Sequence, residues 1–500
     1  MLKKSLWSSF ATNPLKYPKL EGDIAVDVAI IGGGITGITT AQTLTERGFK
    51  VAVLEARSVG YGTTGHSTGN LYIIIDELLS SLKSKYDNDV VMRVIESRKS
   101  ALEKIEENVE KFNIDCDFSR QPLYLYEDVN NIILEEIKVA EEINLAFTEL
   151  AEDFPFEQDN GIHFDHQAQF NPLLYVLGLA ASLDKEKCSI YENTTVRSVE
   201  EQADRVLVNT DDAIVAAKYV VHATHTPKGL ELQYHTTLGP YREYGVAAKL
   251  ESTSYPQGIF WGYYNNQKYS IRSYSRDGEK YLIAVGSPHK VGQAENNRKH
   301  VEDLVNFLQD RFIVGQITYT WGGQNYKPAD LLPYIGRKIK NSREFIATGF
   351  STDGLIYGTL SAMIIADKIE DKFNRFEDLY EAARHQPVKS AKKFVKENAN
   401  VAGEFLKDLS FKGDDKDLLE IMPGEAAIIT RNGEKAGVYR QQNGELKVVS
   451  ALCTHMACMV HWNNLEESWD CPCHGSRFDT SGEVIEGPAY HPLPKKIIEK

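Results

Sequence analysis

The chain has 500 residues, more than one hydrophobic core usually supports, so about two to four domains are expected. Its formal net charge of −15 argues against nucleic acid and against an anionic membrane surface as partners. It has no apolar run of about 18 residues, so no transmembrane segment is expected. The first residues lack the apolar segment of a signal peptide, and six cysteines are too few for a disulfide scaffold, so we expect a cytoplasmic protein.

The first elements along the chain form a strand–turn–helix–strand unit. Residues 27–31 are continuously apolar, as in a buried strand, and residues 38–47 have helical periodicity before Gly48. Residues 50–54 read as the next strand, which ends at Glu55. Such a βαβ unit places the turn after its first strand at the start of a helix.

The turn of this unit carries a glycine motif. Gly32, Gly34 and Gly37 have the G-x-G-x-x-G spacing, which lets the backbone approach a pyrophosphate at the helix N-terminus. Glu55 stands where an acid accepts hydrogen bonds from ribose hydroxyls. We therefore predict a dinucleotide site, and the alternative is a structural turn with a solvated Glu55.

Farther along, helices alternate with short strands before an aromatic-rich sheet. Buried strands are expected at residues 123–126 and 344–349. Between residues 241 and 286, aromatic and β-branched residues alternate with turn signals, which predicts an antiparallel sheet. Residues 385–417 read as a helical linker, and from residue 418 short strands between Gly turns predict a small β-domain. Helical patterns cover residues 89–112, 128–149, 172–183, 296–311 and 355–370.

Two features favour FAD over NAD as the dinucleotide. The glycine fingerprint occurs once, near the N-terminus, whereas a reductase that uses both cofactors should carry a second one. A second glycine turn over residues 346–354, with Gly349 and Gly354, opens another helix. Its backbone N–H groups and helix dipole suit the isoalloxazine end of a long cofactor.

These features resemble the FAD-dependent family of D-amino acid oxidase and glycine oxidase over about residues 24–375. The resemblance implies an extended FAD, with a mixed sheet at about residues 238–321 over the flavin. It also implies a small amine or amino acid as the hydride donor. Further matching segments are residues 62–69, 219–224, 330–336 and 347–354. Motif and resemblance together assign cofactor binding to Gly32, Gly34, Gly37, Glu55, Thr63, Thr64, His66, Gly349 and Gly354.

The loop of residues 62–69, Gly-Thr-Thr-Gly-His-Ser-Thr-Gly, is also similar to a loop of dimethylglycine and sarcosine dehydrogenases. The histidine of those enzymes is bonded covalently to the flavin, which makes His66 the candidate for such a link. This chain has Gly65 where those relatives have a bulky aromatic residue. The alternatives are that His66 forms a hydrogen bond near the flavin or is an ordinary loop residue.

Residues that bind the substrate are weakly indicated. An Arg–Tyr pair commonly clamps a carboxylate, although a single residue of a Tyr-rich sheet is more often structural. At residues 323–325 the chain has Gly-Gln-Asn where the family frequently has an Arg-Pro pair, which weakens an amino-acid substrate. The candidates are Tyr241, Arg242, Tyr269, Arg272, Tyr274 and Trp321.

Two short clusters near the C-terminal end each supply one cysteine and one histidine. The first contains Cys453 and His455, and the second contains Cys471 and His474. Two thiolates and two imidazoles are the ligands of a Rieske [2Fe–2S] centre. Zinc is the competing metal because Cys₂His₂ sites are common, but structural zinc usually uses C-x₂-C pairs.

The surrounding residues resemble the Rieske proteins of cytochrome bc and b6f complexes over about residues 418–498. The resemblance implies a disulfide between Cys458 and Cys473 that ties the two ligand loops together. It also matches Ser476 to a serine that bonds a bridging sulfide. Phe478 replaces a tyrosine that bonds a cysteine sulfur in high-potential members, and the loss of that hydrogen bond should lower the reduction potential.

The sequence thus predicts an α/β, Rossmann-like FAD-binding domain with a mixed or antiparallel substrate sheet, and a small all-β Rieske domain. The expected boundaries are residues 24–384, a linker at 385–417, and residues 418–500. We expect a dehydrogenase or oxidase that passes electrons from a small amine or amino acid through FAD to the cluster, and then to an acceptor protein or quinone. The alternative is an electron-transfer protein that serves a partner oxygenase or cytochrome without its own substrate. A Rieske oxygenase is disfavoured because no two-His-one-carboxylate motif for mononuclear iron stands out.

Overall fold

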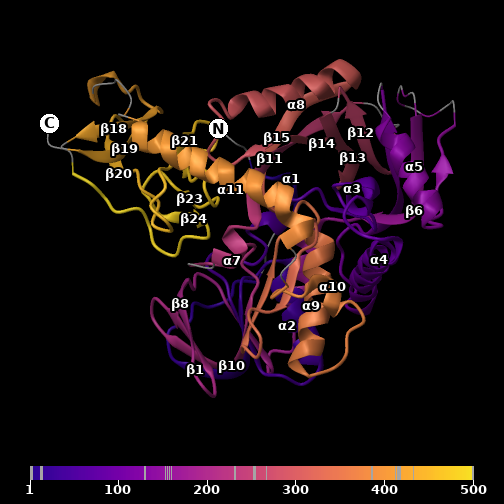
Figure 1. The fold of residues 1–500 in the computed structure, drawn as a ribbon, viewed down its shortest axis with the longest axis horizontal. Coiled ribbons are helices and arrows are strands. Elements are labelled where there is room, and N and C mark those ends of the chain that lie inside the picture. Colours follow the sequence, from indigo (N-terminus) through magenta and orange to yellow (C-terminus); the bar gives the residue numbers. More distant parts are fainter. Residues whose placement is uncertain are drawn as a thin grey trace.

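Two large sheets and two small sheets organise the chain in a computed structural model (Figure 1). The structure describes residues 4–11, 15–128, 131–151, 154, 156, 158, 160–229, 232–251, 255–265, 267–384, 387–411, 413, 418–431 and 433–497. Besides the helices introduced below, it contains α1 (Leu6–Phe10), α3 (Leu79–Lys83), α4 (Asn88–Lys111), α6 (Pro172–Ala181), α7 (Leu232–His235) and α10 (Glu377–Tyr380).

The first large sheet has eight strands and contains the predicted βαβ unit. β1 (Ile24–Ile31) pairs in parallel with β2 (Val51–Leu54) and with β10 (Ile214–His222). These strands are apolar runs because a parallel sheet is buried on both faces. α2 (Ile35–Glu46) and α9 (Gly354–Ile369) pack against each other on one side of it. The other strands are β7 (Cys188–Tyr191), β8 (Val196–Glu201), β9 (Val206–Thr210), β16 (Tyr334–Arg337) and β17 (Glu344–Thr348).

The second large sheet has nine strands and is mixed, as expected. Its edge places β11 (Leu238–Leu250) between β14 (Glu279–Lys290) and β15 (Val314–Pro328). Earlier segments complete it, because β4 (Ser119–Glu127) pairs in parallel with β12 (Ile259–Tyr264). The predicted range of 238–321 is therefore incomplete, since pairing across such a separation leaves no local signal. The other strands are β3 (Asn70–Leu71), β5 (Thr148–Glu149), β6 (Asn160–Gln169) and β13 (Gln267–Arg276).

One face of the second sheet is covered by α8 (Arg298–Arg311), whose Leu304, Phe307 and Leu308 pack against its apolar side chains. The predicted helix over residues 128–149 is wrong in extent. The observed helix, α5 (Ile132–Glu142), is followed by Asn144 in the left-handed conformation, with φ of 54°, which ends the helix and lets β5 begin.

The predicted linker helix is present as α11 (Pro387–Ser410), which runs from the lower part of the molecule to the C-terminal part (Figure 1). The acidic stretch at residues 414–417 lies outside the described residues. α11 is docked on the second sheet through Glu397, which accepts hydrogen bonds from Lys290 at 2.7 Å and from Tyr241 at 3.0 Å. The exact domain boundaries remain a prediction.

The C-terminal part is all-β, as predicted, and consists of two small antiparallel sheets. η2 (Leu418–Glu420) precedes them, and they enclose a core that contains all four cysteines of this region. Their strands are β18 (Ala426–Arg431), β19 (Glu434–Arg440), β20 (Leu446–Ser450), β21 (His461–Asn463), β22 (Ser468–Asp470), β23 (Arg477–Phe478) and β24 (Val484–Glu486).

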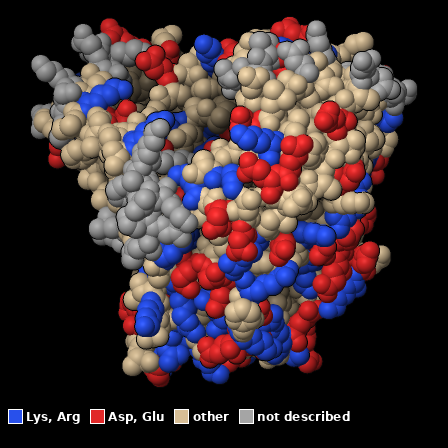
Figure 2. Space-filling model, turned by 45° about the vertical axis from the view of Figure 1, so that its right-hand side comes forward, with Lys and Arg blue, Asp and Glu red and all other residues tan. Residues whose placement is uncertain are grey.

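Acidic and basic side chains are interspersed over the face drawn in Figure 2, which shows no extended basic patch of the kind that binds nucleic acid. Among the helices that the structure describes, none is long and apolar enough to cross a bilayer.

Candidate active site and iron–sulfur centre

A single cavity of about 1160 Å³ connects the glycine turn, the inner face of the second sheet and the C-terminal part. It begins at Gly32 and Gly34 beside Glu55 and continues along residues 62–68. From the C-terminal part it is lined by Glu466, Arg477, residues 483–487 and Tyr490. Residues of the predicted FAD-binding domain and of the C-terminal domain therefore line one partly open cavity.

The glycine turn has the close packing that a pyrophosphate site requires. Gly32 has a φ of 112°, and a Cβ there would lie 2.4 Å from the Ala223 carbonyl oxygen. A Cβ on Gly37 would lie 1.9 Å from the Gly32 carbonyl oxygen. Glu55 accepts a hydrogen bond from the Gly33 amide at 2.7 Å, which fixes its carboxylate beside the cavity. The residues present thus fit an extended dinucleotide.

The loop predicted to hold Thr63, Thr64 and His66 forms the short helix η1 (Thr63–His66), and all three residues line the cavity. Thr64 Oγ1 accepts a hydrogen bond from the Ile35 amide at 3.1 Å, which ties the loop to the start of α2. His66 Nδ1 lies 2.9 Å from the Gly62 carbonyl oxygen. Burial lowers the pKa of His66, so its imidazole is neutral at physiological pH.

The second glycine turn also reaches the cavity. Residues 350–352 and Gly354, at the start of α9, line it. Gly349 has a φ of 76° and turns the chain, but it does not itself line the cavity. The expectation that this turn presents backbone to the cofactor therefore rests on Gly354 and its neighbours.

The four candidate cluster ligands converge in the C-terminal core. Cys453 and Cys471 are free, buried thiols in the same hydrophobic core. The rings of His455 and His474 are 5.1 Å apart, and the buried Nδ1 atom of each has no hydrogen-bond partner. Burial lowers the pKa of His474 to about 3, so the ring is the neutral, ligating form. Two thiols and two orphaned imidazole nitrogens fit a Rieske cluster.

The loops around these ligands are joined as the resemblance implied. Cys458 and Cys473 form a disulfide, with Cα atoms 6.5 Å apart. Ser476 is fully buried, and its hydroxyl accepts a hydrogen bond from the Ala489 amide at 3.1 Å. Phe478 is fully buried in the same core, where it brings no hydrogen-bonding group.

Comparison with known proteins agrees with this architecture. The model of the FAD dependent oxidoreductase family matches residues 27–368, and that of the Rieske [2Fe-2S] domain matches residues 414–496. The chain belongs to the FAD-dependent oxidoreductases and carries a C-terminal Rieske domain. It is an enzyme whose cofactors are FAD and one [2Fe–2S] cluster.

One relative matches almost the whole chain, and others match about three quarters of it. The chain is 32% identical over 503 residues to the putative Rieske 2Fe-2S iron-sulfur protein YhfW of Bacillus subtilis, covering 98% of this chain and 97% of that protein. It is 25% identical over 406 residues to gamma-glutamylputrescine oxidoreductase of Escherichia coli, covering 77% of this chain and 92% of that protein. Glycine oxidase from Geobacillus kaustophilus has the same fold over 72% of this chain and 99% of its own, with a TM-score of 0.60 and 20% identity.

The Rieske domain turns the two candidate ligand histidines toward the FAD-dependent oxidoreductase domain. His455 Nε2 lies 3.0 Å from the Gly229 carbonyl oxygen, and His235 Nε2 lies 2.8 Å from the same oxygen. The His235 ring packs 4.6 Å from that of His455 and 5.6 Å from that of His474. Sequence reasoning missed His235 and Gly229, because nothing local marks residues that cover a ligand from another domain.

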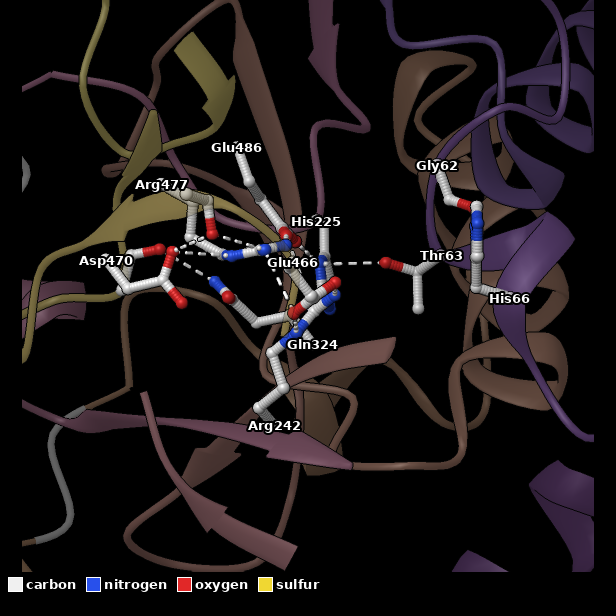
Figure 3. Close-up of polar contacts among 12 residues, drawn as sticks. Gly62, Thr63, His66, His225, Arg242, Gln324, Glu466, Asp470, Arg477 and Glu486 are labelled. Carbon is white, nitrogen blue, oxygen red and sulfur yellow. Dashed lines mark hydrogen bonds and ion pairs between the residues drawn. The ribbon is translucent and has the colours of Figure 1, made fainter. Parts of the chain in front are cut away.

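A buried ionic network crosses the same boundary (Figure 3). Arg242 of β11 forms two hydrogen bonds of 2.5 Å with Glu466 of the Rieske domain. Glu466 also accepts an ion pair from Arg477 at 3.0 Å, and Arg477 pairs with Asp470 at 3.0 Å. Figure 3 shows Glu466 between the two arginines, with Gly62, Thr63 and His66 on the right of the view, beyond His225.

Glu486 lies 3.9 Å from both Arg242 and Arg477, and His225 connects Glu486 to the loop of residues 62–69. His225 Nδ1 lies 3.0 Å from a Glu486 carboxylate oxygen and 3.3 Å from Thr63 Oγ1. Side-chain contacts through His225 therefore link the Rieske domain to the loop that contains His66.

The predicted carboxylate clamp is not formed by the candidate arginines. Arg242 is engaged by Glu466, and Arg272 donates hydrogen bonds to the carbonyl oxygen of Gly69 at 2.8 Å and to other carbonyl groups. Tyr274 donates to Asp117 at 2.8 Å. Arg242 nevertheless lines the cavity, as Trp321 does. Tyr269 stacks on Phe307, and Tyr241 donates a hydrogen bond to Glu397.

Proposed function

We propose that this chain oxidises a small amine or amino acid at FAD and delivers the electrons to its own Rieske cluster. The single observation that carries the proposal is the shared cavity, which residues of both domains line. Arg477 and residues 483–487 of the Rieske domain line the same space as Gly32, Gly34 and Glu55. When bound, the flavin accepts a hydride and the cluster takes electrons one at a time.

Short bonded routes join this cavity to the cluster loops. Gln324 lines the cavity, and its Nε2 donates a hydrogen bond of 2.8 Å to the carbonyl oxygen of Gly475, which lies next to His474. Lys228 also lines the cavity and is adjacent to Gly229, the carbonyl partner of His455. Each cluster histidine is thus within a few covalent and hydrogen bonds of a cavity-lining residue.

The chain's own residues supply binding and water exclusion. Gly32, Gly37 and Glu55 shape the dinucleotide end, and the loop at residues 62–68 borders the cavity farther along. Glu466 and Arg242 hold the Rieske domain against the cavity with a buried ion pair. Fixing both domains in one chain removes the need for a diffusional encounter between donor and acceptor.

An anaerobic titration tests the proposal. The purified protein is mixed with a panel of amines and amino acids, while the flavin is followed by visible absorption and the reduced cluster by EPR. The expected result is bleaching of the flavin by at least one compound together with a Rieske EPR signal. A flavin that bleaches while the cluster stays oxidised would contradict electron delivery. Reduction only by NADPH or a partner protein would support the electron-transfer alternative instead.

A further inference from the structure

At the end of the cavity next to the second sheet, acidic side chains outnumber basic ones. Lys268 forms an ion pair with Asp76, and Lys327 pairs with Glu77 at 2.7 Å. Glu243 lines the same cavity and makes no direct hydrogen bond or ion pair within the described residues, but the charges of Lys327 and Lys268 act on its carboxyl group. Three carboxyl groups, those of Asp76, Glu77 and Glu243, therefore share two ammonium groups at this end of the site.

The backbone explains why the Glu243 side chain points into the cavity and makes no direct ion pair. The pairing of β11 with β14 shifts register between Arg242 and Tyr244, so Glu243 lies at a β-bulge, a feature that redirects side chains. On the other side its partner in β15 is Gly323, which has no side chain to meet it. The carboxylate consequently faces the cavity.

Two further groups at this end are buried polar groups without hydrogen-bond partners, an amide oxygen that accepts and a phenol that can donate or accept. Asn325 is 4% exposed and lies diagonally from Glu243 on the same face of the sheet, and its Oδ1 has no hydrogen-bond partner. Tyr263 is 6% exposed, lines the cavity, and its hydroxyl also has no partner. Buried polar atoms without partners are uncommon, and both of these residues line the cavity, where a bound ligand can supply the partner.

The cationic groups nearby are already neutralised. Arg242 is held by Glu466, and the ammonium groups of Lys268 and Lys327 each have a carboxylate partner. A substrate carboxylate would add a fourth acidic group to a site where Asp76, Glu77 and Glu243 already outnumber the two lysines. An ammonium group would instead neutralise Glu243 and donate hydrogen bonds to it and to Asn325 Oδ1.

We infer that Glu243 is the residue that binds the cationic nitrogen of the substrate, and that the substrate is an alkylammonium compound rather than an amino acid held by its carboxylate. This inference deepens the proposed function and rests on it for the identity of the cavity as the substrate site. It also accounts for Gly323, since a larger residue opposite Glu243 would fill the space beside the carboxylate.

A pair of shape-matched ligands tests the inference without turnover. The tert-butylammonium ion carries no hydrogen on the carbon that bears nitrogen, so it cannot be oxidised to an imine, and pivalate has the same shape with the opposite charge. Binding of each is measured from the visible difference spectrum of the flavin in the complete protein. The variants are E243Q and E243D, with E251Q as the control, because Glu251 is an exposed acid just beyond the end of β11.

The expected result is that tert-butylammonium binds more tightly than pivalate and that E243Q weakens its binding by about tenfold or more. E243D should retain part of the affinity and E251Q all of it. A Kd that changes less than about twofold in E243Q, a preference for pivalate, or the binding of neither ligand would overturn the inference.

Turnover distinguishes this inference from the proposed function. If tert-butylammonium binds through Glu243 but no amine bleaches the flavin, the proposed oxidation fails while the binding site stands. If amino acids reduce the flavin equally well in E243Q and in the unaltered protein, the inference fails while the proposed oxidation stands.

Discussion

Arg242 and Glu466 form a bidentate ion pair across the boundary between the flavin and Rieske domains, with both N–O distances at 2.5 Å. Their side chains are 5% and 9% exposed, so neither charge is solvated. Glu466 also pairs with Arg477, which makes it the shared anion of two arginines from different domains. Because each charge depends on the others, the network specifies one docking geometry for the two domains.

Removing Arg242 should weaken the contact between the FAD-dependent oxidoreductase domain and the Rieske domain. In R242M, Glu466 loses one of its two cationic partners in a buried site, and we expect a loss of about 3–5 kcal/mol in the free energy of unfolding. Denaturant unfolding measures the stability, and stopped-flow absorption measures how fast the cluster is reduced after the flavin. The stability and the rate of cluster reduction should both decrease in R242M.

The control is an exposed ion pair on the same sheet. Lys249 and Glu279 lie 2.7 Å apart with side chains 53% and 42% exposed, so E279Q should change stability by less than about 1 kcal/mol. Equal effects of R242M and E279Q would show that the buried network is not what holds the domains.

The glycine turn should tolerate no added methyl group. In G37A the new Cβ would meet the Gly32 carbonyl oxygen at 1.9 Å, so the turn must open and FAD should be lost. The ratio of flavin absorbance to protein absorbance checks this directly. G403A is the matched control, because a Cβ on Gly403 of α11 meets nothing within 4 Å, and it should keep full flavin content.

Low pH should weaken the contact between the two domains because it protonates Glu466. Burial raises the pKa of this carboxyl, but Arg242 and Arg477 outweigh burial and lower it from 4.5 to about 2. A carboxyl with a lowered pKa in the folded state contributes stability that is present above its unfolded pKa and is lost as the pH falls toward the folded value.

The stability difference between the unaltered protein and E466Q should therefore be constant above about pH 5 and shrink between about pH 4.5 and pH 2. Denaturant unfolding at a series of pH values measures it. A difference that does not depend on pH would mean that Glu466 is not ionised in the folded protein.

The buried Phe478 should set the cluster toward a lower reduction potential. A hydroxyl at this position that reaches a ligating sulfur stabilises the more negative reduced cluster, so F478Y should raise the potential. A redox titration followed by EPR or circular dichroism gives the value. An unchanged or lower potential would show that the added hydroxyl does not reach a sulfur.

Several parts of the site could be predicted because their residues are neighbours in the sequence. The turn from Gly32 to Gly37 needs only one strand, one helix and the steric freedom of glycine. Cys453 with His455, and Cys471 with His474, likewise fall within two short loops, so ligand chemistry is visible in the spacing alone.

Other parts of the site consist of residues that are distant in the sequence and meet only in the tertiary structure. Glu243 faces a cavity bordered by Asp76 and Lys327 only because a β-bulge and a glycine partner direct it there. Arg242 looked like a substrate clamp until domain docking placed Glu466 against it. Local motifs depend on backbone sterics and ligand type, which sequence order preserves, whereas charge pairing and burial depend on contacts that form when distant segments pack.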